Sequence, residues 1–160
     1  TNKDMKKSNH IDNLGNVGMV DVSDKNITNR KAIATGKITL SKAALDSIKL
    51  NKNKKGDVLT IAQIAGIQAA KKTSILVPLS HQLNIKGVNI RFEINSESIT
   101  CISEIICDEK TGVEIEALCA TQIALLTIYD MCKYLDRSMI ISDIKLLLKE
   151  GGKSGTYIAK

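Results

Sequence analysis

The fold of this chain is decided by residues 116–135, which read EALCATQIALLTIYDMCKYL. Twelve of the sixteen residues from Ala117 to Cys132 are apolar, and they surround the whole helix instead of forming one stripe. A helix that is apolar on every side must be buried on every side. A small sheet in the same domain can cover only one side, so we expect another side to pack on a second subunit. The residues alone predict self-association through this long central helix.

Two shorter helices are predicted before it. Ser41 suits the N-cap of a helix that runs through Leu50, and Asp57 suits the N-cap of an apolar segment from Val58 to Ala69. The apolar residues of this second segment predict a well-buried helix. Pro78 ends regular structure and opens a loop.

Strand patterns occupy four segments, residues 31–40, 84–95, 99–107 and 139–148. The second alternates apolar and polar residues, and a short turn at residues 96–98 joins it to the third, which is typical of an antiparallel hairpin. Helices and strands in this mixed order favour an α+β fold with the helices on one face of an antiparallel sheet.

One domain between two flexible ends is predicted. A chain of 160 residues, 43% hydrophobic and 25% charged, can bury one ordinary core. Residues 1–18 are polar and predicted to be flexible, residues 19–150 form the domain, and residues 151–160 form a flexible Gly-rich tail. Because the sequence begins at Thr1 instead of Met, we expect a native N-terminal segment to be missing from it.

The composition disfavours several functions. A net charge of +6 attracts phosphates, nucleic acid or anionic lipid. Only 2% of residues are aromatic, so bases of single-stranded nucleic acid have little to stack on. Polar residues interrupt the longest apolar stretch, which makes it a poor membrane span. The four cysteines include no C-x-x-C pair, which favours free thiols in a reducing compartment over a metal site.

Charged residues mark both ends of the central helix. Asp130 and Lys133 share one face, and the residues alone favour a structural ion pair over a lysine that moves protons. Glu114 and Glu116 either complement the helix N-terminus or belong to a site. The fourteen residues from Glu116 to Asp130 span about 21 Å in a continuous helix, so the two acidic groups cannot meet within one chain. An antiparallel two-fold pairing of this helix would bring them together.

Six motifs occur in order between His10 and Gly155. They are MVDVSDK (Met19–Lys25), KKGDVLTIAQIAGIQAAKKT (Lys54–Thr73), VPLSHQL (Val77–Leu83), KTGVEIEAL (Lys110–Leu118), LTIYDMCK (Leu126–Lys133) and LLKEGGKSG (Leu147–Gly155). Together they closely resemble the cyclic pyranopterin monophosphate synthase family, molybdenum cofactor biosynthesis protein C.

This resemblance implies a ferredoxin-like fold and a homohexamer, a trimer of dimers with active sites at the dimer interface. The implied enzyme is a lyase of the phosphorus–oxygen type. It converts 3′,8-cyclo-7,8-dihydro-GTP, made by a radical SAM GTP 3′,8-cyclase, into cyclic pyranopterin monophosphate and pyrophosphate. No bound cofactor or metal site is implied, and Mg²⁺ with the triphosphate is left open. The expected location is the cytoplasm, or the mitochondrial matrix for a eukaryotic protein.

The motifs also imply residue roles. Lys133 resembles the catalytic lysine that moves protons, Asp130 the carboxylate that orients it, and Lys55 a second active-site lysine. The implied substrate-binding residues are Leu79, Ser80, His81, Glu114, Ile115 and Glu116, together with Lys149, Lys153 and Arg30 on the phosphate side.

Three departures from the family pattern fall in these motifs or directly after them. The family usually has Cys-His-Pro where this chain has Ser80, His81 and Gln82, Met at Ile115, and Asp-Phe at Thr156 and Tyr157. None removes an ionisable catalytic candidate.

Two rival functions remain at this stage. One is a non-catalytic member of the same fold that binds a nucleotide or phosphorylated partner through Lys55, Lys149 and Lys153. The other is a basic RNA-binding oligomer, which the scarcity of aromatic residues disfavours.

Overall fold

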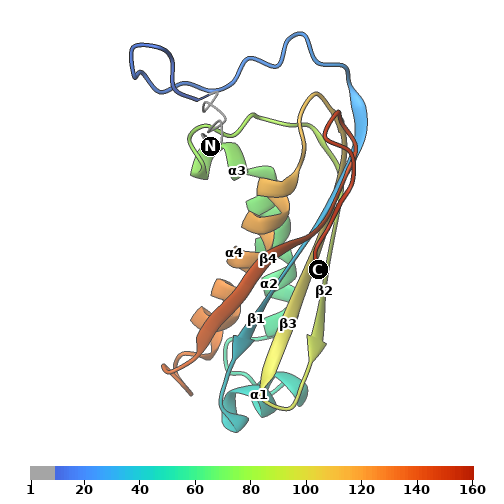
Figure 1. Ribbon diagram of the computed structural model, residues 1–160. Coiled ribbons are helices and arrows are strands. Elements are labelled where there is room, and N and C mark those ends of the chain that lie inside the picture. Colours follow the sequence, from blue (N-terminus) through green and yellow to red (C-terminus); the bar gives the residue numbers. More distant parts are fainter. Residues whose placement is uncertain (1–9) are drawn as a thin grey trace, which may run out of the picture.

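Nine helices and strands follow one another along the chain in the computed structural model, which describes residues 10–160 (Figure 1). In order they are β1 (Thr28–Thr39), α1 (Lys42–Lys49), α2 (Val58–Lys71), α3 (Thr73–Leu76), β2 (Ile85–Ile94), β3 (Ser98–Glu109), α4 (Glu114–Cys132), β4 (Ile140–Glu150) and β5 (Tyr157–Ile158). Residues 1–9, half of the segment predicted to be flexible, lie outside the described residues.

The strands form one antiparallel sheet in the order β2-β3-β1-β4-β5. Strand β1 pairs with β3 along its full length, from Thr28 opposite Glu109 to Thr39 opposite Ser98. Its residues alternate between a buried face and a half-buried face, as the side-chain period of two requires. The order of the first four strands and the two helical crossovers confirm the predicted α+β, ferredoxin-like fold.

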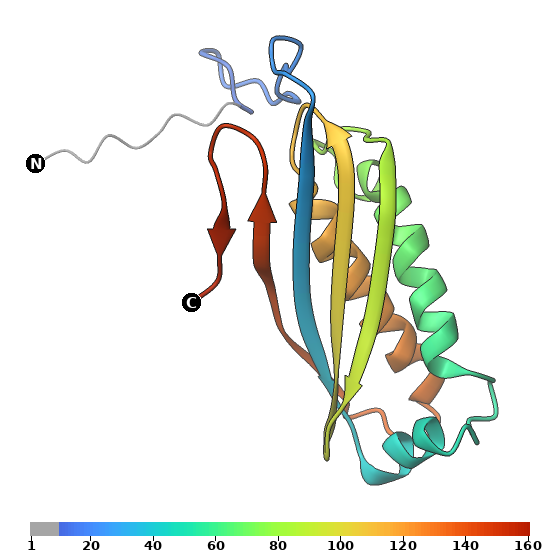
Figure 2. The same cartoon turned by 90° about the vertical axis from the view of Figure 1, so that its right-hand side faces the viewer.

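Helices α2 and α4 both cover the same face of this sheet (Figure 2). Small residues meet where Gly66 of α2 faces Ala120 and Ala124 of α4, and all three are buried. Small side chains let two helix backbones approach closely. Larger apolar side chains of α4, such as Leu125, fill the space between the helix and the sheet.

Both predicted N-caps are present. The Ser41 hydroxyl accepts a hydrogen bond from the backbone N–H of Ala44 at 3.2 Å, and Asp57 Oδ1 accepts one from Thr60 N–H at 3.1 Å. Each side chain therefore satisfies a backbone donor that the helix itself leaves unpaired.

The prediction that α2 is well buried is wrong for the single chain, because Ile61 and Ile64 on its outer side are exposed. Helix α4 behaves similarly, with Ile115 exposed and Leu126 52% exposed. The sheet and the neighbouring helix cover only part of the surface of each helix. The apolar residues on every side of α4 had predicted that some of them would stay uncovered in a single chain. Packing of these surfaces on another subunit stays a prediction.

Helix α4 is also the one helix in residues 10–160 that is long and apolar enough to cross a membrane by length and composition. Half of its apolar window is buried inside the chain, and the core helix of a soluble protein passes the same test. Its contacts with the sheet and α2 account for the buried half of this apolar window.

The sequence did not predict α3 or β5, and it placed the ends of α4 two or three residues too late. After α4 the chain continues as a turn over residues 133–135, in which the Cys132 carbonyl accepts from the N–H groups of Leu135 and Asp136. The Gly-rich tail turns back so that Tyr157 pairs with Lys149 of β4. Its flexibility stays a prediction.

We expect Gly66→Val to lower the free energy of unfolding by about 1–3 kcal/mol, because larger side chains strain a packed interface. A Cβ at Gly66 would collide with Ile90 Cδ1 and lie 3.1 Å from the Ala120 carbonyl oxygen. Chemical denaturation measures the change. Gln68→Val, at an exposed position of the same helix, is the matched control and is expected to change stability by less than about 1 kcal/mol. Equal effects of the two variants would show that close packing at Gly66 is not the cause.

Candidate functional site

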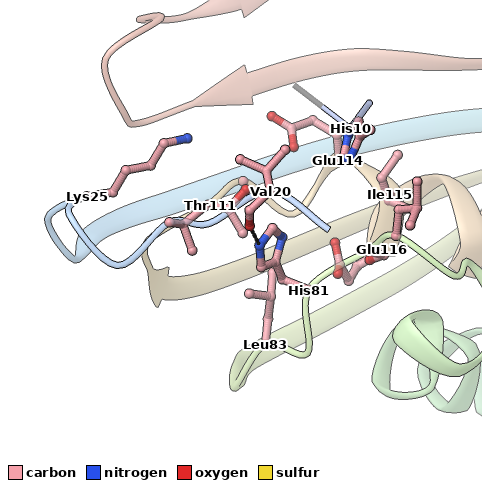
Figure 3. A pocket seen from close by; sticks show the side chains of 13 residues that line it. His10, Val20, Lys25, His81, Leu83, Thr111, Glu114, Ile115 and Glu116 are labelled. Atoms are coloured by element: carbon pink, nitrogen blue, oxygen red, sulfur yellow. Dashed lines mark hydrogen bonds between the residues drawn. The ribbon is translucent and has the colours of Figure 1, made fainter. Parts of the chain in front are cut away.

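A pocket of about 480 Å³ lies beside the N-terminal end of α4 (Figure 3). We call it the histidine–glutamate pocket. It is enclosed by the segment before β1, the loop after α3, and the loop that leads from β3 into α4. Its lining residues are His10, Val20, Val22, Lys25, Leu79, Ser80, His81, Leu83, Thr111, Gly112, Glu114, Ile115 and Glu116. The structure therefore brings together all six substrate-binding residues predicted in the loop and at the helix start.

His81 links the N-terminal segment to this pocket. Its Nε2 lies 2.5 Å from the carbonyl oxygen of Val20, the contact drawn as a dashed line in Figure 3. A carbonyl oxygen can only accept, so Nε2 carries the hydrogen and donates. His81 thus holds residues around Val20 at the rim of the pocket as well as lining it.

Glu116 is the buried acid of the pocket, with only 3% of its surface exposed. Burial raises the pKa of its carboxyl group to about 7, and the negative charge of Glu114 adds to the rise, while the backbone N–H of Glu116 itself opposes it. Near neutral pH a large fraction of Glu116 is therefore protonated. A protonated carboxyl group can both donate and accept a hydrogen bond, which suits recognition of a heterocyclic base.

A second cavity of about 450 Å³, which we call the basic pocket, adjoins the first, since Lys25 lines both. It is lined by Lys25, Asn26, Thr28, Arg30, Gly152, Lys153 and Ser154, with three cations and no acidic residue. Among residues 10–160, Thr28 Oγ1 is the one buried side-chain oxygen or nitrogen atom without a hydrogen-bond partner. Buried polar atoms are nearly always paired, so this oxygen suits a ligand atom in the pocket.

The three predicted phosphate-side residues lie around this cavity in different ways. Lys153 and Arg30 line it, but Arg30 also donates from Nε to the Glu109 carbonyl at 2.9 Å and from Nη2 to the Lys110 carbonyl at 3.1 Å. Lys149 is not among the lining residues, and its Nζ donates to Ser154 Oγ and to the Gly155 carbonyl. Arg30 thus holds the loop between β3 and α4, and Lys149 holds the loop after β4, which lines the basic pocket through Gly152, Lys153 and Ser154.

The predicted catalytic residues Lys55, Asp130 and Lys133 gather at the opposite, C-terminal end of α4, and we call them the lysine–aspartate cluster. Lys133 Nζ lies 2.9 Å from Asp130 Oδ1, and Lys55 Nζ donates to the backbone carbonyl of Asp130 at 3.0 Å. The hydrogen bond from Lys133, followed by the charges of Lys133 and Lys55, lowers the pKa of Asp130. The side chains of Lys133 and Asp130 are 50% and 62% exposed, so the single chain gives this lysine no dry surroundings.

The cluster and the two pockets stand at opposite ends of one unbroken helix. Fourteen residues of α4 separate Glu116 from Asp130, which is about 21 Å along the axis. A nucleotide-sized ligand in the pockets of one chain does not reach the lysine–aspartate cluster of the same chain.

Comparison with known proteins gives this arrangement a family. The profile of the MoaC family matches residues 19–152. The chain belongs to the MoaC family.

Several relatives match over nearly the whole chain. A protein of Clostridium perfringens (strain SM101 / Type A), named cyclic pyranopterin monophosphate synthase, is 52% identical over 155 residues, covering 94% of this chain and 97% of the relative. One of the same name from Limosilactobacillus fermentum is 49% identical over 149 residues, covering 92% and 90%. The molybdenum cofactor biosynthesis bifunctional protein of Chlorobaculum tepidum is 51% identical over 145 residues, covering 91% of this chain and 46% of that protein.

Membership of the MoaC family does not by itself identify every lining residue. Lys25 belongs to the quoted motif MVDVSDK but was given no role, although it lines both pockets. His10 lies in the segment predicted to be flexible, yet its Nδ1 contacts the Gly18 carbonyl at 3.1 Å and it lines the histidine–glutamate pocket. The grouping of polar residues in residues 10–25 is the sequence feature that could have predicted these two lining residues.

Stability should depend on pH through Glu116. Its carboxyl group has a raised pKa in the folded chain, so the folded state holds this proton more tightly than the unfolded state. The resulting stabilisation is complete below the ordinary glutamate pKa and is lost as pH rises to about 7. We expect Glu116→Gln to remove this loss and to raise the free energy of unfolding at pH 8 by up to about 3 kcal/mol.

Chemical denaturation of both proteins between pH 4.5 and pH 8 measures this difference. Glu97→Gln, an exposed site in the turn between β2 and β3, controls for the general loss of one negative charge. Parallel stability curves for the parent chain and Glu116→Gln would contradict the assignment.

Proposed function

We propose that the chain is a cyclic pyranopterin monophosphate synthase that takes 3′,8-cyclo-7,8-dihydro-GTP as substrate and releases pyrophosphate. The observation that carries this proposal is the match of about 50% identity to synthases of that name, together with the charged residues at both ends of α4. Each of the three sites is proposed to act on a different chemical part of the substrate. The histidine–glutamate pocket takes the base-derived rings, the basic pocket takes the phosphates, and the lysine–aspartate cluster moves protons.

The basic pocket suits a triphosphate for physical reasons. Lys25, Arg30 and Lys153 bring three positive charges to its wall, and charge-assisted hydrogen bonds to phosphate oxygens are the strong ones. Closure of the cyclic phosphate forms a bond between a substrate hydroxyl oxygen and the α-phosphorus and breaks the bond to the bridging oxygen. Pyrophosphate leaves with that oxygen, and the hydroxyl proton must pass to a base.

Lys133 and Lys55 are the groups proposed to exchange protons during ring opening and closure. A lysine works as a base only when its surroundings lower its pKa, which requires burial or nearby positive charge. Since both Lys133 and Asp130 are half-exposed or more in the single chain, a second subunit must cover them. We therefore propose that the active site lies between two chains. The family resemblance implies that these chains form a homohexamer built as a trimer of dimers.

The remaining parts of the proposal follow from the pathway. A radical SAM GTP 3′,8-cyclase supplies the substrate, and the expected location is the cytoplasm. The proposed enzyme has no bound cofactor, and participation of Mg²⁺ with the triphosphate is left open. Among residues 10–160, no group of three or more His, Cys, Asp or Glu side chains is placed to hold a metal ion.

Single-turnover assays with enzymatically made substrate test the function and its catalytic residues together. The parent chain should release pyrophosphate in step with a pterin product that becomes fluorescent on oxidation. Lys133→Ala and Asp130→Ala should each lower the rate by about 10²- to 10⁴-fold, the usual loss when a proton-transfer group is removed. Lys42→Ala, whose side chain is 88% exposed on α1, should keep the parent rate. Substrate binding without pyrophosphate release in the parent chain would replace the enzyme by the nucleotide-binding alternative.

Mixed oligomers test whether two chains share each site. We expect Glu116→Ala, which removes the carboxyl group proposed to recognise the base-derived rings, and Lys133→Ala to be inactive alone and, when co-expressed, to recover about a quarter of the parent activity. Half of randomly assorted dimers are mixed, and one of their two sites then carries both intact ends. Co-expression of Lys133→Ala with Asp130→Ala places both defects in the same cluster and should recover nothing. Recovery in neither mixture would assign each site to a single chain.

A further inference from the structure

The C-terminal end of α4 is completed by a loop from a distant part of the chain. The last four carbonyl groups of a helix have no partner within it. Here the Tyr129 carbonyl accepts from Lys133 N–H, and the Cys132 carbonyl accepts from Leu135 and Asp136. The two carbonyls between them, of Asp130 and Met131, receive their hydrogen bonds from the loop between α1 and α2.

Asn53 is the buried centre of that loop. Its Nδ2 donates to the Met131 carbonyl at 3.0 Å and lies 3.6 Å from Cys132 Sγ, while its Oδ1 accepts from the backbone N–H of Lys55 at 2.8 Å. One amide group therefore fixes the backbone of Lys55 relative to the helix end. Aspartate has the same shape but no donor, so only the amide can make both sets of bonds.

Lys54 also ties this loop to the segment that follows α4. The Tyr134 hydroxyl accepts from the backbone N–H of Lys54 at 3.0 Å, and the Lys54 ammonium group lies 4.2 Å from the centre of the Tyr134 ring. Gly56, at φ +111°, then turns the chain into the Asp57 cap of α2. Lys55 stands between two anchored neighbours, and its Nζ reaches the Asp130 carbonyl at 3.0 Å.

We propose that Asn53, assisted by Tyr134, is a positioning residue that holds Lys55 in register with Asp130 and Lys133. This inference rests on the proposed function, because it assigns Asn53 a part in the proton-transfer chemistry of the same site. Asn53 is too deeply buried to touch a substrate, so its effect must pass through Lys55. A displacement of a reacting group by about 1 Å can cost about 100-fold in rate. Hydrogen bonds that fix the backbone of Lys55 therefore keep its long side chain in the position needed for catalysis.

Kinetics of the assembled protein with Asn53→Ala, Lys55→Ala and the double variant test this role. Asn53→Ala should lower kcat by about 10- to 100-fold with little change in KM. The double variant should be no slower than Lys55→Ala, because Asn53 acts only by positioning the Lys55 side chain, which both variants lack. Tyr134→Phe keeps the ring and loses only the hydroxyl, so it should show a smaller drop in kcat that also disappears in the Lys55→Ala background. Asn89→Ala, an exposed asparagine on β2, should match the parent chain.

Hydrogen exchange gives a readout that does not depend on turnover. Amides of residues 53–56 should exchange faster in Asn53→Ala and Tyr134→Phe, while those in the middle of α2 keep their protection. If Asn53→Ala does not fold, the Tyr134→Phe cycle with Lys55→Ala decides the matter.

The outcomes separate the two proposals. An active parent chain in which the losses from Asn53→Ala and Lys55→Ala multiply would overturn the positioning role and leave the enzyme intact. A parent chain that forms no product would overturn the proposed function, and unchanged exchange at residues 53–56 would then overturn the positioning role as well.

Discussion

The unbroken length of α4 governs both the core and the site. Along one side, the small residues Ala120 and Ala124 let α2 approach, and Leu125 fills the space above the sheet. The same rigid packing keeps the two ends of the helix apart, with acids at its start and a lysine–aspartate pair at its end. A helix that holds the sheet together in this way cannot bend to unite its own ends. Because the proposed chemistry needs both ends of the helix, this separation predicts that a second subunit completes the site.

Two carboxyl groups on this helix have opposite electrostatic surroundings. Glu116 lies among buried groups at the N-terminal end, where burial raises its pKa to about 7. Asp130 is exposed and beside two lysines, which lower its pKa. One acid can thus donate a proton or a hydrogen bond at neutral pH while the other stays a carboxylate. This separation of roles comes from burial and neighbours, since both groups belong to the same helix.

Patterns local in sequence predicted most of the fold. Alternation along the β2–β3 hairpin and the caps at Ser41 and Asp57 rest on neighbouring residues, and the structure has each of them. Strand β5 is only two residues long and depends on pairing with β4. Two residues are too few to show the alternation of apolar and polar side chains that predicts a strand. The candidate site divides in the same way, because the motifs named Lys55 and His81, whereas the contacts of Asn53 and Val20 join residues 78 and 61 positions apart. Contacts of that range follow from the assembled fold and leave no mark in local sequence.

The exposed outer side of α4 connects the core to the chemistry. Its surface includes Ile115 beside the histidine–glutamate pocket and Leu126 one turn before Asp130. Covering these side chains would remove apolar area from water and would at the same time dehydrate Lys133 and Asp130, which share that side of the helix end. Burial of a charged pair is costly unless its hydrogen bonds are complete, and here the ion pair and the Lys55 contact are already made within the chain. Association of the apolar surfaces would then also remove Lys133 from water and so favour its neutral form, which can accept a proton. An isolated subunit would be folded and yet unable to move protons efficiently.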